Sequence, residues 1–373
     1  MEESKEITTT TSSCASTDLV TDVFHQILMR VSLNTLNPCR EVCKDWLKLT
    51  HESYFANLQT QNSNGKIVSG YYIQCLKPVN RYTCTYVSKN PTTSSLDLKF
   101  LPTNYYDATK IVASSSQGFL CCVTQSRIPR YYVCKPTTKE WRKIANPKTR
   151  YFTVSMAMVV RTNPLNFIIV RLSSLLSCFS SHLQCEIYLS KYNKWKKSKD
   201  IKLPSTMYLP QGSAVSSNGA LHWLTNEDCI FAFNYNQENW TLLSLPEEAT
   251  MNTNNRKQLV KYEHKLALLS MGEEWMELWV MQNYAKRLWN KRLCVKLNPI
   301  VGNNELVDLY TSDVAFARGF CKVMWYNYIN NSHTEVDTKF PITHLDEIFP
   351  FYSDSEYSFL GGDLSFGNSG RVL

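Results

Sequence analysis

The chain has 373 residues, of which 43% are hydrophobic and 19% are charged. These values are ordinary for a folded protein, so they exclude wholesale disorder and a collagen-like or coiled-coil rod, and the length predicts two or three folded units. The formal net charge of +8 is a small basic excess that indicates no dedicated nucleic-acid partner. Aromatic residues make up 12% of the chain, which favours β-structure because their side chains suit a pleated, half-buried surface.

Residues 1–17 are rich in Ser and Thr and have no apolar core, which predicts a disordered tail and no secretory signal. The most apolar region, 154–179, contains Arg161 and Arg171, so we expect no membrane-spanning segment. The 13 cysteines are odd in number and include no Cys-x-x-Cys pair, which favours reduced thiols and no metal site. We therefore expect an intracellular protein, located in the cytoplasm, the nucleus or both.

The segment 18–60 has apolar residues at helical spacing and predicts three short helices. The first ends at Ser32, the second opens near Pro38, and the polar run 61–69 follows as a linker. So small a unit buries too little apolar surface to be stable alone. Spacing alone leaves open whether its wide apolar face binds a partner or packs on the rest of the chain.

The run from Leu19 to Val31, followed by Leu36, Arg40 and the sequence Val-Cys-Lys-Asp-Trp that ends at Trp46, resembles the F-box. Val20 and Ser32 stand where that family usually has proline. The resemblance implies docking onto the Skp-type adaptor of an SCF-type cullin-RING ubiquitin ligase. The adaptor-binding residues that it implies are Leu19, Val23, Phe24, Ile27, Leu28, Val31, Leu36, Val42, Cys43, Trp46 and Leu49.

The pattern changes to short apolar strands separated by polar turns over residues 70–350. In four copies a strand and a turn are followed by a returning strand that opens with tryptophan, at Trp141, Trp195, Trp240 and Trp289. These tryptophans are 54, 45 and 49 residues apart, a period typical of a β-propeller, and the region has room for about six blades. We expect the four side chains to pack between blades, and residues 351–373 to form a C-terminal tail.

The same region resembles the F-box-associated domain of plant F-box proteins, a kelch-like propeller. The resemblance is carried by Ser-Gln-Gly-Phe-Leu-Cys-Cys at 116–122 and by Lys-Pro-Thr-Thr-Lys-Glu-Trp at 135–141. The expected fold class is therefore α+β and multidomain, with a small three-helix F-box followed by an all-β propeller-like domain.

No nucleophile, nucleotide-binding or metalloprotease motif occurs, so we expect no catalytic residues and no cofactor. His222 is the one histidine that merits attention, although a lone strand histidine beside tryptophan is more often packed than a ligand. The basic run from Lys191 to Lys199 could meet acidic or phosphorylated groups, but lysines more often protect a strand edge.

Two functions fit these features. The first is a non-catalytic substrate-recognition subunit that captures an unknown client protein, with client contacts expected on variable loops such as 125–130 or 252–256. The second is a propeller enzyme or carbohydrate-binding protein with an N-terminal helical cap. Copurification of the adaptor would discriminate between them.

Overall fold

The computed structural model describes residues 68–352 apart from short gaps, and Val42. The gaps are 78–80, 90–95, 103–107, 163–164, 176, 178, 211, 252–254, 273, 298–303 and 344–345. By its internal contacts the chain divides into two units, 1–66 and 67–373. Among the described residues, no helix is long and apolar enough to cross a membrane.

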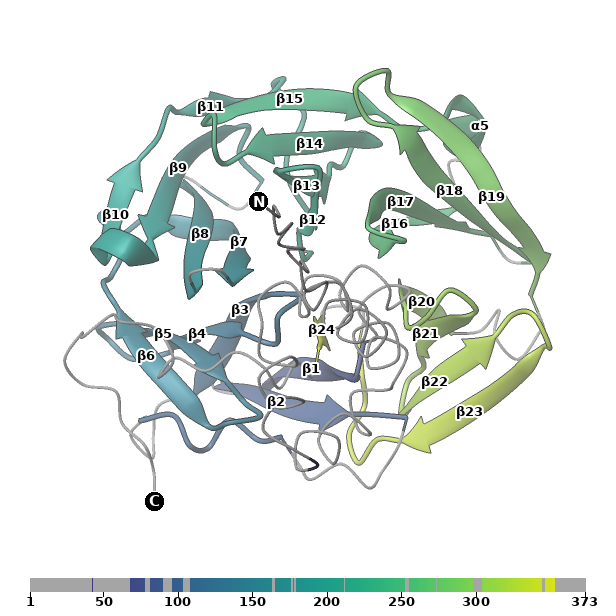
Figure 1. The fold of residues 1–373 in the computed structure, drawn as a ribbon, viewed down its shortest axis with the longest axis horizontal. Coiled ribbons are helices and arrows are strands. Elements are labelled where there is room, and N and C mark those ends of the chain that lie inside the picture. Colours follow the sequence, from purple (N-terminus) through teal and green to yellow (C-terminus); the bar gives the residue numbers. More distant parts are fainter. Residues whose placement is uncertain are drawn as a thin grey trace, which may run out of the picture. The chain divides into compact units, whose positions relative to one another are not determined.

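Six antiparallel sheets, arranged around a common axis, form the second unit (Figure 1). Each is a run of strands joined by short turns, as the alternation of apolar runs and turn residues predicts. The first four-strand blade consists of β3 (Thr109–Ser114), β4 (Leu120–Thr124), β5 (Tyr131–Lys135) and β6 (Glu140–Ile144). The second consists of β7 (Phe152–Thr162), β8 (Leu165–Ser174), β9 (His182–Leu189) and β10 (Lys194–Lys197), with β11 (Ile201–Lys202) beside β9. The third consists of β12 (Val215–Ser217), β13 (Ala220–Leu224), β14 (Cys229–Asn234) and β15 (Asn239–Ser244). The next two are β16 (Arg256–Tyr262), β17 (Lys265–Met271), β18 (Trp275–Asn283) and β19 (Leu288–Lys296); and β20 (Glu305–Leu309), β21 (Val314–Arg318), β22 (Lys322–Asn327) and β23 (Ser332–Asp337).

The sixth blade joins the two ends of the described propeller. Its strands are β24 (Glu347–Phe351), β1 (Gly70–Lys77) and β2 (Arg81–Val87), with β1 in the middle. The pairing of Gly70 with Phe351 and of Gln74 with Glu347 fixes the register. The innermost strand of this blade thus comes from the far end of the chain, and it closes the ring. The prediction of about six blades is confirmed.

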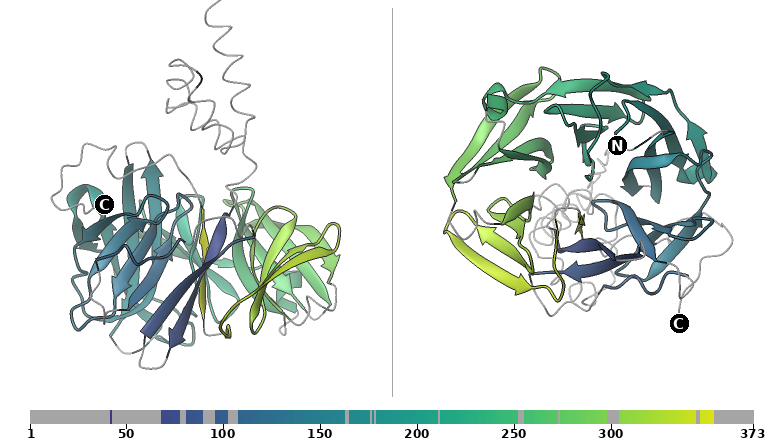
Figure 2. Two further views of the ribbon diagram at one scale, coloured as in Figure 1. Left: turned by 90° about the horizontal axis from the view of Figure 1, so that it is seen from below. Right: turned by 180° about the vertical axis from the view of Figure 1, so that it is seen from behind.

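The propeller has two faces, because the strands of each blade alternate in direction between them (Figure 2). We call the linker face the one at which each innermost strand begins. It carries the loops between second and third strands and the segments that link one blade to the next. The opposite face, here the hairpin face, carries the turns between first and second and between third and fourth strands.

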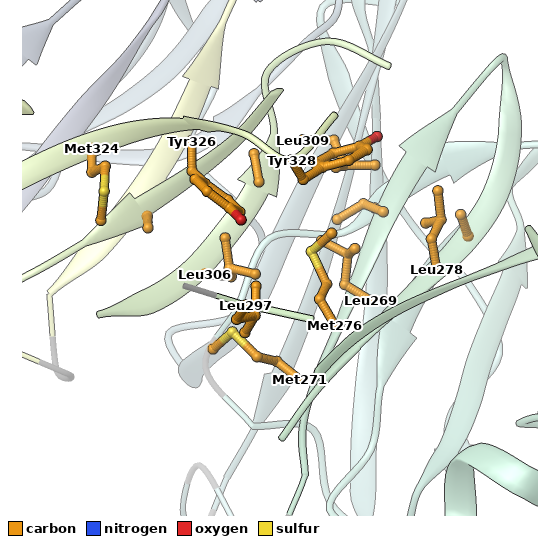
Figure 3. Packing of buried hydrophobic residues seen from close by; sticks show 14 of the residues in the cluster. Leu269, Met271, Met276, Leu278, Leu297, Leu306, Leu309, Met324, Tyr326 and Tyr328 are labelled. Carbon is orange, nitrogen blue, oxygen red and sulfur yellow. The ribbon is translucent and has the colours of Figure 1, made fainter. Parts of the chain in front are cut away.

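The hydrophobic core is divided into six clusters, each shared by two neighbouring blades. Figure 3 shows the cluster between the blade of β16 to β19 and the blade of β20 to β23, where Leu269 and Met276 face Leu306 and Met324. Because each blade buries both of its faces, apolar residues occupy successive positions of the middle strands rather than alternate ones. In β17, for example, every residue from Leu266 to Met271 is buried.

The expected α+β fold class is wrong. The part of the chain that the structure describes is nearly all β, with the single short α-helix α5 (Glu247–Met251) and the 3-10 turn η2 (Ser190–Tyr192). The three helices expected over 18–60 lie outside the described residues, except that Val42 has helical backbone and a side chain that is 65% exposed. The strands therefore determine the class of the described residues.

Candidate functional site

Exposed large apolar side chains are concentrated on the linker face of the propeller. Of the eleven in its described residues, eight lie there and three on the hairpin face. The eight are Leu76, Ile128, Phe152, Leu175, Phe179, Met251, Trp275 and Phe320. An exposed large apolar side chain costs free energy in water, so the excess of such side chains on the linker face makes it the candidate binding surface.

The loop between β4 and β5 reaches the linker face in an ordered conformation. The buried Thr124 hydroxyl accepts a hydrogen bond from the backbone N–H of Arg130 (3.0 Å), and the Ser126 hydroxyl donates to the carbonyl of Ile128 (2.6 Å). The Gln125 N–H also donates to the carbonyl of Ala108, at the start of the innermost strand (2.8 Å). These bonds hold the loop while its tip, 127–130, stays exposed.

The segment between β6 and β7 lies beside this loop, because the Asn146 amide donates to the carbonyl of Pro129 (2.9 Å). Its backbone is fixed from below by the carboxylate of Glu186 on β9. Glu186 accepts hydrogen bonds from the N–H groups of Lys148 (2.9 Å) and Thr149 (3.1 Å). The segment thus presents side chains at the linker face from an anchored backbone.

Glu186 is itself buried and paired with Arg171 of β8 at 2.6 Å. The Arg171 guanidinium also donates to the carbonyl oxygens of Thr149 and Tyr151 and to the hydroxyl of Thr153. A buried ion pair is costly unless its remaining hydrogen-bonding atoms are satisfied, and here the linking segment satisfies them. The pair therefore acts as a clamp on that segment.

The two candidate client loops named from the sequence both belong to the linker face. Residues 125–130 form the β4–β5 loop, and Asn255 and Arg256 enter β16 from the same side, while 252–254 lie outside the described residues. Sequence reasoning missed Phe152, Phe179 and Phe320. The available signal was an aromatic residue within a turn-rich stretch.

His222 is a packed residue, as its sequence context favoured. It is fully buried on β13, with Nδ1 3.0 Å from the carbonyl of Val215 and Nε2 2.8 Å from the hydroxyl of Tyr284. A carbonyl only accepts, so Nδ1 carries the proton and the Tyr284 hydroxyl donates to Nε2. Burial lowers the pKa of His222 to about 4, which keeps the ring neutral.

A second shifted group, Asp308 on β20, lies beside the buried Tyr71. Burial raises the pKa of Asp308 to about 7, although the N–H of Leu309 donates to the carboxylate at 2.8 Å and opposes the rise. The Asp308 carboxylate in turn raises the pKa of two neighbouring phenols, those of Tyr71 and Tyr352. In the described part of the chain, no three potential ligand residues are grouped so as to hold a metal ion.

The basic run between Lys191 and Lys199 spans η2, the edge strand β10 and the two residues that follow it. Lys196 pairs with Glu238 at 2.6 Å and Lys197 with Asp200 at 3.5 Å. This placement fits the protection of a strand edge. Of the eleven adaptor-binding residues implied by the F-box resemblance, only Val42 is described, and the other ten lie outside the described residues.

Comparison with known proteins adds the family context. Residues 79–342 match the family model described as the F-box associated beta propeller domain. F-box protein At5g49610 of Arabidopsis thaliana is 28% identical over 296 residues, covering 75% of this chain and 80% of that protein. F-box protein At5g41720, also of Arabidopsis thaliana, is 30% identical over 160 residues, covering 41% and 84% respectively. Among solved structures, YCF48 bound to D1 peptide aligns with a TM-score of 0.41 and 8% identity over 72% of this chain and 82% of that one.

Proposed function

Because the chain belongs to the F-box-associated β-propeller family, we propose that it is the substrate-recognition subunit of an SCF-type cullin-RING ubiquitin ligase. The observation that carries this proposal is the family match, which spans most of the described propeller and agrees with relatives that are named F-box proteins. In this role the protein itself makes and breaks no covalent bonds. It acts inside the cell, in the cytoplasm, the nucleus or both.

The mechanism is a gain in effective concentration. A client held by one part of the chain, while another part is held by the ligase, meets the ubiquitin-charged enzyme far more often than a free client does. The propeller suits the client half of this task, because its scaffold of buried strands leaves the loops at its faces free to differ. The linker face, with most of the exposed apolar side chains, supports assignment of the client to that face.

The other half of the task is binding to the Skp-type adaptor, through the eleven residues that resemble the F-box surface. We propose that Ile27 and Trp46 are the main anchors among them. Large apolar anchors typically supply most of the binding energy of an interface, and loss of one costs about 2 kcal/mol or more. The exposed Val42 side chain is accessible to such a partner.

Copurification tests this proposal. The full chain should retain a purified Skp-type adaptor on a pull-down resin, and Ile27→Ala or Trp46→Ala should weaken adaptor binding by about 30-fold, the equivalent of 2 kcal/mol. Ile128→Ser on the linker face is the matched control, and we expect it to bind the adaptor like the unaltered chain. Full adaptor retention by a folded Ile27→Ala/Trp46→Ala double variant would rule out this mode of docking.

A further inference from the structure

We propose that one sector of the linker face binds an acidic peptide segment of the client that carries an apolar anchor. This basic sector consists of the exposed residues of the β4–β5 loop and the β6–β7 segment: Arg127, Ile128, Arg130, Lys148, Arg150 and Phe152. The inference rests on the proposed function and deepens it, since it specifies the chemistry that the client must offer.

The charge of the sector is of one sign. Its four cationic side chains are exposed, and none forms an ion pair with a residue that the structure describes. Residues 125–130 and 145–152 contain no Asp or Glu. The carboxylate beneath them, Glu186, is fully buried and already neutralised by Arg171. The sector therefore has uncompensated positive charge at the surface, which attracts an acidic ligand.

Carboxylates gather at another part of the linker face, around the β13–β14 loop and α5, so this part is less favourable for an acidic ligand than the basic sector. The loop between β13 and β14 contributes Glu227 and Asp228, and α5 contributes Glu247 and Glu248. Asp228 pairs with Lys257 at 2.6 Å and Glu248 with Lys291 at 2.8 Å, whereas Glu247 has no ion pair with a described residue. Like charges repel across an interface, so these carboxylates disfavour an acidic segment there and favour its binding at the basic sector.

The apolar part of the sector is as prominent as its charge. Ile128 is 71% exposed and follows Arg127 directly, and Phe152 is 55% exposed and lies two residues after Arg150. Interfaces typically place apolar anchors among charged groups that fix the orientation of the ligand. The matching ligand has carboxylates or phosphates next to a large apolar side chain.

The backbone of the sector is held in place before any ligand arrives. Thr124 fixes one loop, the Asn146 amide joins the two segments, and the Arg171–Glu186 pair fixes the second. A preformed site loses less conformational entropy on binding than a flexible one. Nucleic acid is the poorer fit, because a long phosphate backbone that crosses this face would meet the carboxylates of its acidic part.

The binding test uses the full chain copurified with its adaptor, and labelled peptides as probes. The first peptide has glutamates around a Leu-Phe pair, the second has phosphoserines in place of the glutamates, and the third has glutamines. We expect the first or second to bind with an affinity that falls as salt rises, and the third to bind about tenfold more weakly or not at all. A preference between the first two distinguishes carboxylate from phosphate recognition.

The matched variants remove equal charge from the two faces. Arg127→Ser/Arg150→Ser should weaken binding of the preferred acidic peptide about tenfold, whereas Lys194→Ser/Lys286→Ser on the hairpin face should leave it unchanged. Ile128→Ser/Phe152→Ser should weaken binding without changing its dependence on salt. Equal binding of the glutamine peptide, equal loss in both charge variants, or tighter binding of single-stranded nucleic acid would overturn the proposal.

Adaptor retention is measured in the same samples. If the adaptor copurifies while all three peptides fail to bind, the assignment of the basic sector is wrong and the role in the ligase stands. If the adaptor is lost while the acidic peptide still binds, the proposed function fails and the peptide site stands.

Discussion

Some polar residues of this propeller are buried, and some apolar residues are exposed. His222 and Glu186 are buried polar groups with every expected partner present, whereas Ile128 and Phe320 are apolar and exposed. Buried polar groups are tolerated when they are fully hydrogen-bonded, and exposed apolar ones are informative when they share one face. His222 and Glu186 therefore belong to the scaffold, whereas Ile128 and Phe320 are available for binding.

The buried His222 predicts a dependence of stability on pH. Its pKa is about 4 in the folded chain against 6.5 for the free side chain, so between these values the unfolded chain takes up a proton that the folded chain does not. The free energy of unfolding should therefore fall as the pH falls from 6.5 to 4, by about 3 kcal/mol from this group. Urea unfolding of the unaltered chain and of His222→Gln, compared at each pH, measures this contribution.

The unaltered chain must be compared with His222→Gln at each pH, because Asp308 changes the free energy of unfolding in the opposite direction. Its raised pKa of about 7 means that the folded chain takes up the proton first, so this group stabilises the folded chain as the pH falls. Tyr284→Phe is the control. It removes the hydroxyl but not the burial, and it should keep the pH dependence of the unaltered chain. Parallel profiles for His222→Gln and the unaltered chain would show that His222 does not titrate as described.

At the scale of elements, the outer hairpins of the five four-strand blades repeat one local design. The four repeated tryptophans are each the second residue of an outer strand, and His333 has the same place in β23. Two residues earlier the chain has positive φ each time, at Lys139, Asn193, Glu238, Arg287 and Asn331. A left-handed residue after a turn is the usual way to close a hairpin of this length, although it strains residues other than glycine.

The repeated tryptophans join neighbouring blades, as their equivalent positions predicted. The Trp195 indole N–H donates to the carbonyl of Ala145 in the preceding blade (2.6 Å), and Trp289 donates to the carbonyl of Ser244 (3.1 Å). Their burial differs, however: Trp195 is 3% exposed, whereas Trp141, Trp240 and Trp289 are only half-buried. Equivalent positions in the repeat thus do not imply equal contributions to the free energy of unfolding.

This difference gives a ranked prediction. Trp195→Ala should lower the free energy of unfolding by about 3 to 5 kcal/mol, because it leaves a cavity and an unpaired carbonyl in a closed interface. Trp289→Ala should cost clearly less, since water already reaches that side chain. Chemical denaturation of both variants checks the order, with Trp275→Ala on the linker face as an exposed control. An equal loss for Trp195→Ala and Trp289→Ala would contradict the argument from burial.

The whole propeller depends on contacts between the two ends of its sequence. β24 lies between β1 and the axis, Phe351 packs against Tyr72 and Tyr86, and the Ser69 N–H donates to the carbonyl of Phe351 (2.8 Å). Next to this strand Lys110 pairs with Glu347 at 2.9 Å and ties the closing blade to the following one. The ring is therefore closed by backbone pairing, aromatic packing and charge together.

Ring closure predicts that one residue near the C-terminus is as important as any in the core. Phe351→Ala should destabilise the chain by about 3 to 5 kcal/mol, because Phe351 is fully buried. Phe320→Ala makes the same chemical change at a side chain that is 73% exposed, and it should change the free energy of unfolding by less than about 0.5 kcal/mol. Thermal unfolding of the two variants tests the comparison. Equal melting temperatures would mean that β24 does not hold the ring.

The sequence by itself determined the features that depend on neighbours in the chain. The period of the tryptophans, the turns between strands and the number of blades are all local, because each hairpin pairs residues a few positions apart. The family resemblance of the propeller was also readable from such local motifs, and the family match confirms it.

Only the tertiary structure decided which distant residues meet. Gly70 pairs with Phe351, Arg171 and Glu186 clamp a segment that precedes both, and the loops at 125–130 and 145–152 form one basic sector. The sequence could not give these contacts, because the faces of a propeller are defined only once the ring is closed. The error in the expected fold class has the converse cause: spacing along a short segment describes a local preference, whereas the class of the described residues is set by the strands that pack around the axis.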